Sequence, residues 1–526
     1  MTKTNRRIIN IAVFVTGMTS LAIELTASRL VGTIYGNSNL VWATIIGLIL
    51  IFLATGYFLG GRLADRKPIQ STMYQLMFWG GFATGFIPVI AKPIMRFASD
   101  AFDQLQMGIL FGSFGVVLLI LIIPMTMLGM ISPYAIRLSI NGKDTSGKIS
   151  GQLYAISTLG SFIGAFLPVL VLIPTIGTFF TFVTFGFLTC VVALIGLWAG
   201  GERKSIFLYI LSLVILLIVT FWFKGQPLKA SEGQVFETES AYNYIQVLQE
   251  GEYRYLRLNE GQGIHSEWHP SQLFYAGPWE QFLAGPFFNV GGGENSSYDP
   301  SNVKRIAIIG LAAGTAARQA SAVFGAIPID GYEIDPEIID IGKRYFGMDL
   351  PNLNAEAVDG RWGIEHSPYK YDLIIVDAYR PPYIPWHLTT LEFFQIVAQH
   401  LTSKGVLAIN VGRAPDDRQL INGFCGTLAQ VYPSIYVMDL PDTFNSIIYA
   451  TIQPTNVENF YRNLLAFYPR KDIHPLLIEV MERFVVYQKP VEKSSIVFTD
   501  DKAPIEWMTN NLVLNFLLSG EVEKLQ

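Results

Sequence analysis

Three acidic residues in the second half of the chain each follow a stretch that is predicted to be a sheet element. Glu333 ends the apolar run Ile327–Tyr332, Asp377 ends the run Tyr371–Val376, and Asp359 ends an element between them. Because the carboxyl ends of parallel strands form one edge of an open α/β sheet, we expect these carboxylates to line that edge. A carboxylate placed there can accept hydrogen bonds from a ligand or take up a proton.

A turn rich in small residues precedes the first of these acids. The predicted strand Arg305–Ile309 runs into Gly310–Gly314 and then into a helix. Small residues let a ligand approach the backbone, and a helix N-terminus favours a polar group. Such turns are common, but Glu333 follows about 20 residues later, the spacing at which an acid accepts both ribose hydroxyls. We therefore predict a nucleoside pocket, with Asp359 accepting from an adenine amino group and Asp377 as the catalytic group.

Further strands complete an α/β Rossmann-like domain. Alternating apolar and polar residues in Tyr242–Gln249 and Glu252–Leu258 predict a β-hairpin and hence a small β-subdomain at its start. A fifth strand is expected at Gly405–Val411, and a closing antiparallel hairpin at Ile435–Leu440 and Ser446–Thr451. The predicted domains are 1–230, a membrane domain, 231–285, the β-subdomain and entry to the catalytic domain, and 286–526, the catalytic domain.

The first 230 residues are predicted to be a multi-pass α-helical membrane domain. The whole chain is 51% hydrophobic and only 15% charged, with a mean hydropathy of +0.37. A helical span needs roughly 20 apolar residues, and open strands would leave backbone groups unpaired in lipid. About seven runs meet this length: Ile8–Ile34, Leu40–Leu59, Tyr74–Ile94, Met107–Met130, Leu153–Ile173, Thr178–Leu197 and Ile206–Phe223.

Basic residues predict the orientation of this domain in the cell membrane. They gather at the N-terminus and after the second, fourth and sixth runs: Lys3, Arg6, Arg7, Arg62, Arg66, Lys67, Arg137, Lys143, Lys148, Arg203 and Lys204. The positive-inside rule then makes the N-terminus cytoplasmic. Seven crossings would place the second half outside the cytoplasm, whereas a cytosolic nucleoside cofactor favours the cytoplasmic side. The sequence leaves that side open.

Composition excludes several other classes of protein. A net charge of −5 gives no basic face for nucleic acid. The two cysteines, Cys190 and Cys425, form neither a disulfide framework nor a metal-ligand spacing, so no metal is expected. The expected partner of the first half is the lipid bilayer, and assembly into a homo-oligomer is left open.

The second half resembles spermidine synthase, the polyamine aminopropyltransferase family, and the whole chain resembles its membrane-fused branch. The resemblance rests on Ser240–Ile245, on the loop Gly310–Gly314, on Glu333, Asp359 and Gly360, on Asp377, and on the segments Ile384–Phe393 and Phe498–Glu506. It implies that Asn243, Gly310, Gly314, Glu333, Asp359 and Gly360 bind the cofactor. It implies that Asp377 is the catalytic base and that decarboxylated S-adenosylmethionine is the co-substrate.

The departures from this family fall at positions that handle the amine. Ala313 stands where soluble spermidine synthases have an Asp in the glycine loop, and Arg380 replaces the second Asp of an Asp-x-x-Asp motif. Trp279, beside Glu280, stands where the family has a substrate-binding His. An Arg in place of an Asp turns attraction for an ammonium into repulsion, on the order of a few kcal/mol. Arg380 therefore favours an anionic acceptor.

Three functions follow as hypotheses. The first is transfer of an aminopropyl group from decarboxylated S-adenosylmethionine to an amine such as putrescine. The second is an S-adenosylmethionine-dependent methyltransferase acting on an acceptor that is not a polyamine, which Ala313 and Arg380 favour. The third is a membrane carrier or sensor that binds a nucleoside or polyamine without turnover.

Overall fold

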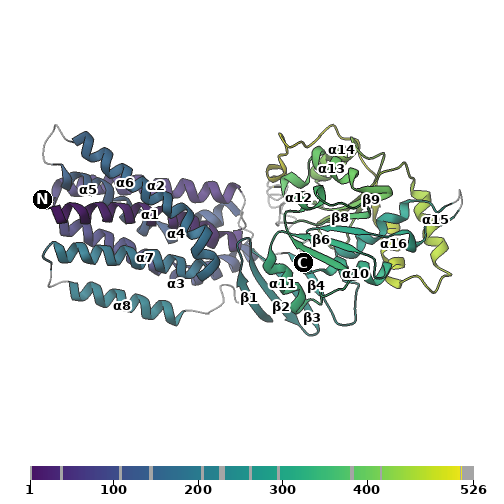
Figure 1. The fold of residues 1–526 in the computed structure, drawn as a ribbon, viewed down its shortest axis with the longest axis horizontal. Helices are drawn as coiled ribbons and strands as arrows, with labels where there is room; N and C mark the ends of the chain where they lie inside the picture. The colour runs from purple at the N-terminus through teal and green to yellow at the C-terminus, as the bar shows by residue number, and fades with distance from the viewer. Residues whose placement is uncertain are drawn as a thin grey trace. The chain divides into compact units, whose positions relative to one another are not determined.

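The chain forms two compact units, Met1–Ser231 and Glu232–Gln526 (Figure 1). The computed structural model describes residues 3–35, 39–105, 109–140, 146–202, 206–223, 231–259, 263–292, 296–379, 384–414, 417–509 and 511. Each unit has hydrophobic clusters of its own.

The secondary-structure elements described in the first unit are all helices. Its helices are α1 (Lys3–Tyr35), α2 (Asn39–Arg66), α3 (Gln70–Leu105), α4 (Ile109–Gly129), α5 (Ile131–Ser139), α6 (Ser146–Leu167), the π-helical turn η2 (Pro168–Leu172), α7 (Ile173–Ala199) and α8 (Ile206–Trp222).

Hydrogen bonds and an ion pair connect several helix ends at one end of this unit. The contacts are Asn5 Nδ2 donating to Gln70 Oε1 (3.3 Å), Arg6 to Gln152 Oε1 (3.1 Å), and Arg137 Nε to Asp65 Oδ1 (2.7 Å). The starts of α1, α3 and α6 therefore lie with the ends of α2 and α5. The basic residues of the described part that set the predicted orientation belong to these helix ends; Lys143, Arg203 and Lys204 lie outside it.

Five helical stretches of the described residues are long and apolar enough to cross a membrane: Thr4–Gly32, Val41–Arg66, Gln70–Ala91, Ser113–Ser139 and Ser146–Ala199. The helix α8 is apolar but shorter. The fifth stretch contains both α6 and α7, and its backbone leaves the helical region at Gly177 (φ 77°, ψ 168°). The predicted runs Leu153–Ile173 and Thr178–Leu197 therefore lie in one helical stretch that is broken at Gly177. The count of seven spans stays a prediction.

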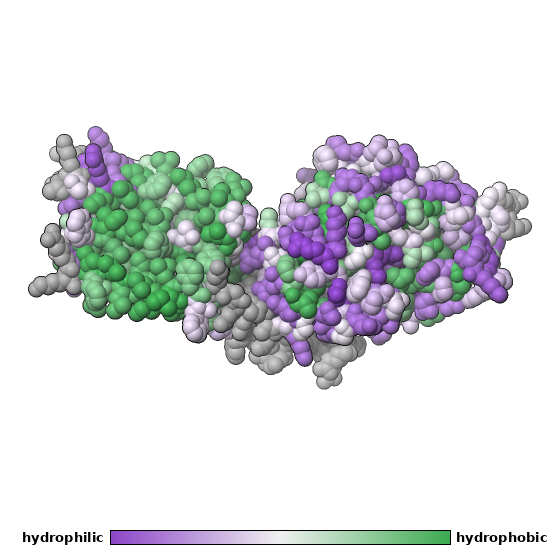
Figure 2. Space-filling view, turned by 60° about the horizontal axis from the view of Figure 1, so that its bottom comes forward, coloured by the Kyte–Doolittle hydropathy of each residue, from purple (hydrophilic) through white to green (hydrophobic). Residues whose placement is uncertain are grey.

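Small residues bring the helices of the first unit together. A Cβ atom at Gly160 or Gly164 of α6 would collide with the α1 backbone at Phe14 or Met18. Large apolar side chains instead lie outside, among them Phe207 at 72% exposure and Trp222 at 78%. Figure 2 shows this hydrophobic surface, in contrast to the polar surface of the second unit.

The second unit begins with a four-stranded antiparallel sheet in the order β1-β2-β3-β4. Its strands are β1 (Gln234–Glu239), β2 (Tyr244–Glu250), β3 (Tyr253–Leu258) and β4 (Ile264–Trp268). The predicted hairpin is present as β2 and β3, with Glu250 paired to Tyr253. The two outer strands, β1 and β4, are not predicted from the sequence pattern.

A mixed eight-stranded sheet in the order β12-β10-β11-β9-β8-β5-β6-β7 forms the rest of this unit. The strands are β5 (Ile306–Ile309), β6 (Ile329–Glu333), β7 (Leu353–Ala357), β8 (Tyr371–Val376), β9 (Leu401–Gly412), β10 (Ser434–Asp439), β11 (Asn445–Thr451) and β12 (Gln488–Lys489). Strands β5 to β9 pair in parallel, and β10 to β12 add antiparallel pairs. This is the expected Rossmann-like arrangement with its closing hairpin.

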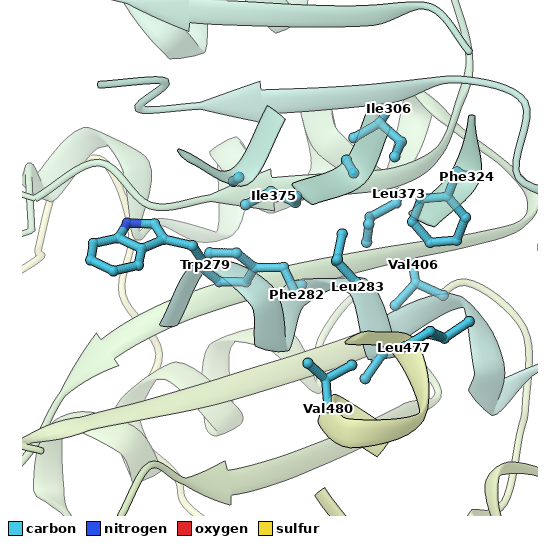
Figure 3. Packing of buried hydrophobic residues seen from close by; sticks show 14 of the residues in the cluster. Trp279, Phe282, Leu283, Ile306, Phe324, Leu373, Ile375, Val406, Leu477 and Val480 are labelled. Carbon is cyan, nitrogen blue, oxygen red and sulfur yellow. The ribbon is translucent and has the colours of Figure 1, made fainter. Parts of the chain in front are cut away.

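Helices and short turns cover the sheet: α9 (Pro278–Gln281), η3 (Phe282–Phe288), η4 (Pro300–Asn302), α10 (Thr315–Phe324), α11 (Pro336–Tyr345), α12 (Gly360–Glu365), η5 (Trp386–Leu388), α13 (Leu391–Gln399), α14 (Gln419–Leu428), α15 (Val457–Phe467) and α16 (Pro475–Tyr487). Figure 3 shows Phe282 and Leu283 of η3 in the core that Leu373 of β8, Val406 of β9 and Leu477 of α16 also fill. This packing holds α9 against the sheet.

Candidate functional site

The glycine loop joins β5 to α10 and lies against the backbone that follows β8. Gly310 and Gly314 have φ values of +84° and +87°, which glycine adopts without the penalty that a side chain brings. A Cβ atom at Gly310 would collide with the backbone of Asp377 and Ala378. Since Ile309 and Val376 are paired in the parallel sheet, the loop and Asp377 start at the same level of the sheet edge.

Glu333 ends β6 and is buried beside this loop. Its carboxylate accepts hydrogen bonds from Ala312 N (2.9 Å) and Asp335 N (3.1 Å). Burial raises the pKa of Glu333 to about 7, although these backbone donors favour the ionised form. The structure thus places Glu333 against the glycine loop, where glycine φ angles and a buried acceptor fit a nucleoside that approaches the backbone.

Asn243 connects the small β-subdomain to the same edge. Its side-chain amide donates to Asp335 Oδ2 (2.9 Å) and accepts from Asn259 Nδ2 (2.9 Å). Asp335 caps α11, and Ser240 also donates to its carboxylate. Asn243 is therefore one residue removed from Glu333 in a continuous hydrogen-bond network.

Asp359 caps α12 and pairs with a histidine. Its Oδ1 accepts from Arg361 N (3.0 Å) and Trp362 N (3.1 Å), and Oδ2 lies 2.9 Å from His387 Nε2. The hydrogen bond with His387 lowers the pKa of this carboxyl. Both oxygens already have partners, so a ligand at Asp359 would share them. Gly360 is required here because a Cβ atom would collide with the Ile309 side chain.

Asp377 directly follows β8 at the carboxyl edge of the sheet. Asn410 of β9 donates to its Oδ1 (2.9 Å), and its own amide donates to Ile309 O (2.9 Å). Burial raises the pKa of Asp377 to about 7, and the hydrogen bond from Asn410 opposes that shift. The side chain can therefore exchange a proton near neutral pH.

Of the positions predicted to bind the amine, the structure describes Trp279, Glu280 and Ala313. Trp279 and Glu280 lie in α9, both buried, and Gln319 donates to Glu280 Oε2 (3.0 Å). Ala313 is fully buried in the glycine loop, and its amide donates to Ser266 Oγ (2.9 Å). Arg380 lies outside the described residues.

Sequence reasoning missed four residues at this edge: Ser266, Glu267, Gln319 and His387. The signal for His387 is its place in the segment Ile384–Phe393, part of the family resemblance. Among the residues that the structure describes, no group of three or more His, Cys, Asp or Glu could hold a metal ion.

Two solved structures are similar to parts of the chain at low identity. A probable spermidine synthase from Corynebacterium glutamicum ATCC 13032 shares 20% identity; the match covers 46% of this chain and 88% of the other, with a TM-score of 0.37. A spermidine synthase from Thermotoga maritima shares 16% identity over 56% of this chain and 87% of the other, with a TM-score of 0.35.

The sequence comparisons find relatives that are named as polyamine aminopropyltransferases. A probable polyamine aminopropyl transferase of Bifidobacterium longum is 29% identical over 287 residues, 52% of this chain and 61% of the relative. A polyamine aminopropyltransferase of Vibrio vulnificus is 29% identical over 187 residues, 34% of this chain and 58% of the relative. The chain thus spans about three fifths of the length of each. Residues 294–462 match the family described as spermine/spermidine synthase domain. The matched residues include the glycine loop, Glu333, Asp359 and Asp377.

Proposed function

We propose that the chain is a membrane-bound polyamine aminopropyltransferase, which transfers an aminopropyl group from decarboxylated S-adenosylmethionine to an amine. One observation carries the proposal: Asp377, a half-buried residue whose carboxyl pKa is raised to about 7, follows β8 at the point where its backbone lies against Gly310 of the glycine loop. The names of the relatives, polyamine aminopropyltransferases, support the reaction class.

The residues at the carboxyl edge of the sheet have separate roles in this reaction, one in proton transfer and the others in binding the co-substrate. When bound, the co-substrate supplies a carbon next to a sulfonium; the C–S bond breaks as a C–N bond forms, and sulfur leaves with the electron pair. The attacking amine must lose a proton, and Asp377 is the group that accepts it. Asn410 fixes the Asp377 carboxylate through Oδ1, leaving Oδ2 for that proton. Glu333 holds the ribose, Asp359 the adenine, and the loop at Gly310 and Gly314 admits the nucleoside.

Calorimetry of the full-length chain in detergent tests the proposal against the methyltransferase alternative. We expect decarboxylated S-adenosylmethionine to bind at least tenfold more tightly than S-adenosylmethionine, and putrescine with the former to yield an aminopropylated product. Binding of the carboxylated form alone would overturn the proposal. Ala313, a fully buried loop residue with no acidic side chain, is the observation that favours the methyltransferase.

The first unit is proposed to span the cell membrane with a cytoplasmic N-terminus. Five long apolar stretches and the basic residues at one set of helix ends support it. Seven passages then place the second unit outside the cytoplasm. Reporter fusions after Lys148 and after Lys224 test this: we expect a cytoplasmic signal from the first only. A cytoplasmic signal from the second would contradict seven passages and give the active site access to the cytosolic cofactor pool.

A further inference from the structure

Strand β4 places Ser266 and the backbone of Glu267 beside the glycine loop and the start of α10. Ser266 accepts from the amide of Ala313 (2.9 Å). At the next residue, Glu267, the backbone exchanges hydrogen bonds with the Thr315 hydroxyl, which accepts from Glu267 N (3.0 Å) and donates to Glu267 O (2.9 Å). Glu267 is therefore fixed at the end of the loop where α10 begins, next to the position at which Ala313 supplies no acid.

A buried acid and a buried amide lie with Glu267. Glu280 of α9 and Gln319 of α10 are both fully buried, and Gln319 Nε2 donates to Glu280 Oε2 (3.0 Å) and to Leu273 O (2.7 Å). Burial, and then the negative charge of Glu280, raise the pKa of Glu267 to about 7. Thr315, which holds the Glu267 backbone, and Gln319, which donates to Glu280, lie one turn apart on α10, so this helix brings β4 and α9 to the same place.

This cluster has buried acceptors with no donor. Glu280 Oε1 and Gln319 Oε1 have no hydrogen-bond partner within the described part of the chain. The cation that acts on Glu280 is Arg483, whose guanidinium lies over the Phe274 ring, and no ion pair joins it to Glu280 there. A buried acceptor without a donor costs about 1–3 kcal/mol, so a ligand that brings donors and positive charge would stabilise the cluster.

We propose that Glu267, with Glu280 and Gln319 behind it, binds a primary ammonium group in place of the acid that Ala313 lacks. An ammonium has three donors and no acceptor, which matches two carboxylates and an amide oxygen. A carboxylate on the same carbon would meet the negative charge of Glu267 and be disfavoured. The inference rests on the proposed function and deepens it, because it selects a cofactor or acceptor that carries a free amine.

Binding measurements on Glu267→Gln in the full chain test the site. The matched control is Glu250→Gln, an exposed acid at the end of β2. We expect decarboxylated S-adenosylmethionine to bind about tenfold more weakly to Glu267→Gln, because a charge-assisted hydrogen bond is lost. Affinity for 5′-methylthioadenosine, which has the nucleoside but no amine, should not change. Loss of putrescine affinity alone would assign the ammonium to the acceptor and still support the site.

Two results would overturn the inference: unchanged affinity for both amines, or an equal loss for 5′-methylthioadenosine. If Glu267→Gln does not fold, Glu280→Gln serves as the second variant, with the same pattern expected among the three ligands. Glu267→Asp should recover most of the affinity because the charge is kept. Should the parent bind the amines and form no product, the proposed transfer fails while the ammonium site stands.

Discussion

The two units of this chain use the same kinds of residue in opposite places. In the first, large apolar side chains such as Phe207 and Trp222 lie outside, while glycine and threonine lie between helices. In the second, apolar side chains fill the core, and Glu333 and Asp335 are buried at the carboxyl end of β6. In water, burial of apolar surface drives folding; between helices in lipid that force is absent, and close packing takes over. This contrast supports the proposal that the first unit spans a membrane, because its exposed surface is apolar and that of the second unit is polar.

Glycine shows the difference most clearly. Gly160 lies in a helix, and a side chain there would strike the backbone of α1. Gly310 has a positive φ, and its missing side chain leaves the space that the backbone of Asp377 occupies. The first glycine permits helices to approach, whereas the second shapes a site. Variants in each unit should therefore alter different properties.

The largest effect is expected from Asp377→Asn. The amide cannot accept a proton, so aminopropyl transfer should fall about 10²–10⁴-fold, with the thermal stability of the first unit unchanged. In the parent, kcat should rise as pH rises towards 7 and then level, because burial raises the Asp377 pKa to about 7 and the ionised form is the base. Asp340→Asn, an exposed acid in α11, is the matched control. Retention of more than a tenth of the parent rate would remove Asp377 from the mechanism.

The next effect belongs to the first unit. Gly160→Leu should lower the free energy of unfolding in detergent by about 1–3 kcal/mol or more, since overpacking forces α6 away from α1. Gly151→Leu in the same helix has no atom within 4 Å of the added Cβ and should change little. Nucleoside binding by the folded fraction should be unaffected in both. Equal stability of the two variants would mean that close packing does not hold these helices.

The sequence predicted features that depend on local patterns. Short apolar runs ending in Glu333 and Asp377 placed both acids at the sheet edge, and glycine spacing located the loop. The outer strands β1 and β4 and the role of Glu267 were not predicted. The sequence pattern of β4 is weak because the strand has only five residues. The position of Glu267 depends on hydrogen bonds with Thr315, which is 48 positions away in the sequence. The His387–Asp359 pair spans 28 positions and depends on tertiary packing that no short window contains.

A moderate effect, confined to binding, is expected from Glu333→Gln. The Gln amide group can replace one acceptor but offers a donor to Ala312 N or Asp335 N, which are donors themselves. Nucleoside affinity should fall by about 1–3 kcal/mol, the cost of unpaired buried groups. The control is Glu356→Gln, exposed on the neighbouring strand β7. Calorimetry with 5′-methylthioadenosine measures the change, and parental affinity would place the ribose elsewhere.

The smallest effect on stability is expected from removing an ion pair at the exposed surface of either unit. Asp65 pairs with Arg137 at 2.7 Å, but their side chains are 71% and 49% exposed. Exposed pairs contribute about 0–1 kcal/mol, so Asp65→Asn should shift the unfolding free energy by less than about 1 kcal/mol, as should Asp340→Asn in the second unit. Both small losses should shrink further in high salt, because exposed charges are screened. A loss of several kcal/mol for Asp65→Asn alone would mean that this pair is shielded from water. The end of the first unit that carries its basic residues would then be shielded from water. The two units would differ in the surroundings of their charged residues as well as in their apolar surfaces.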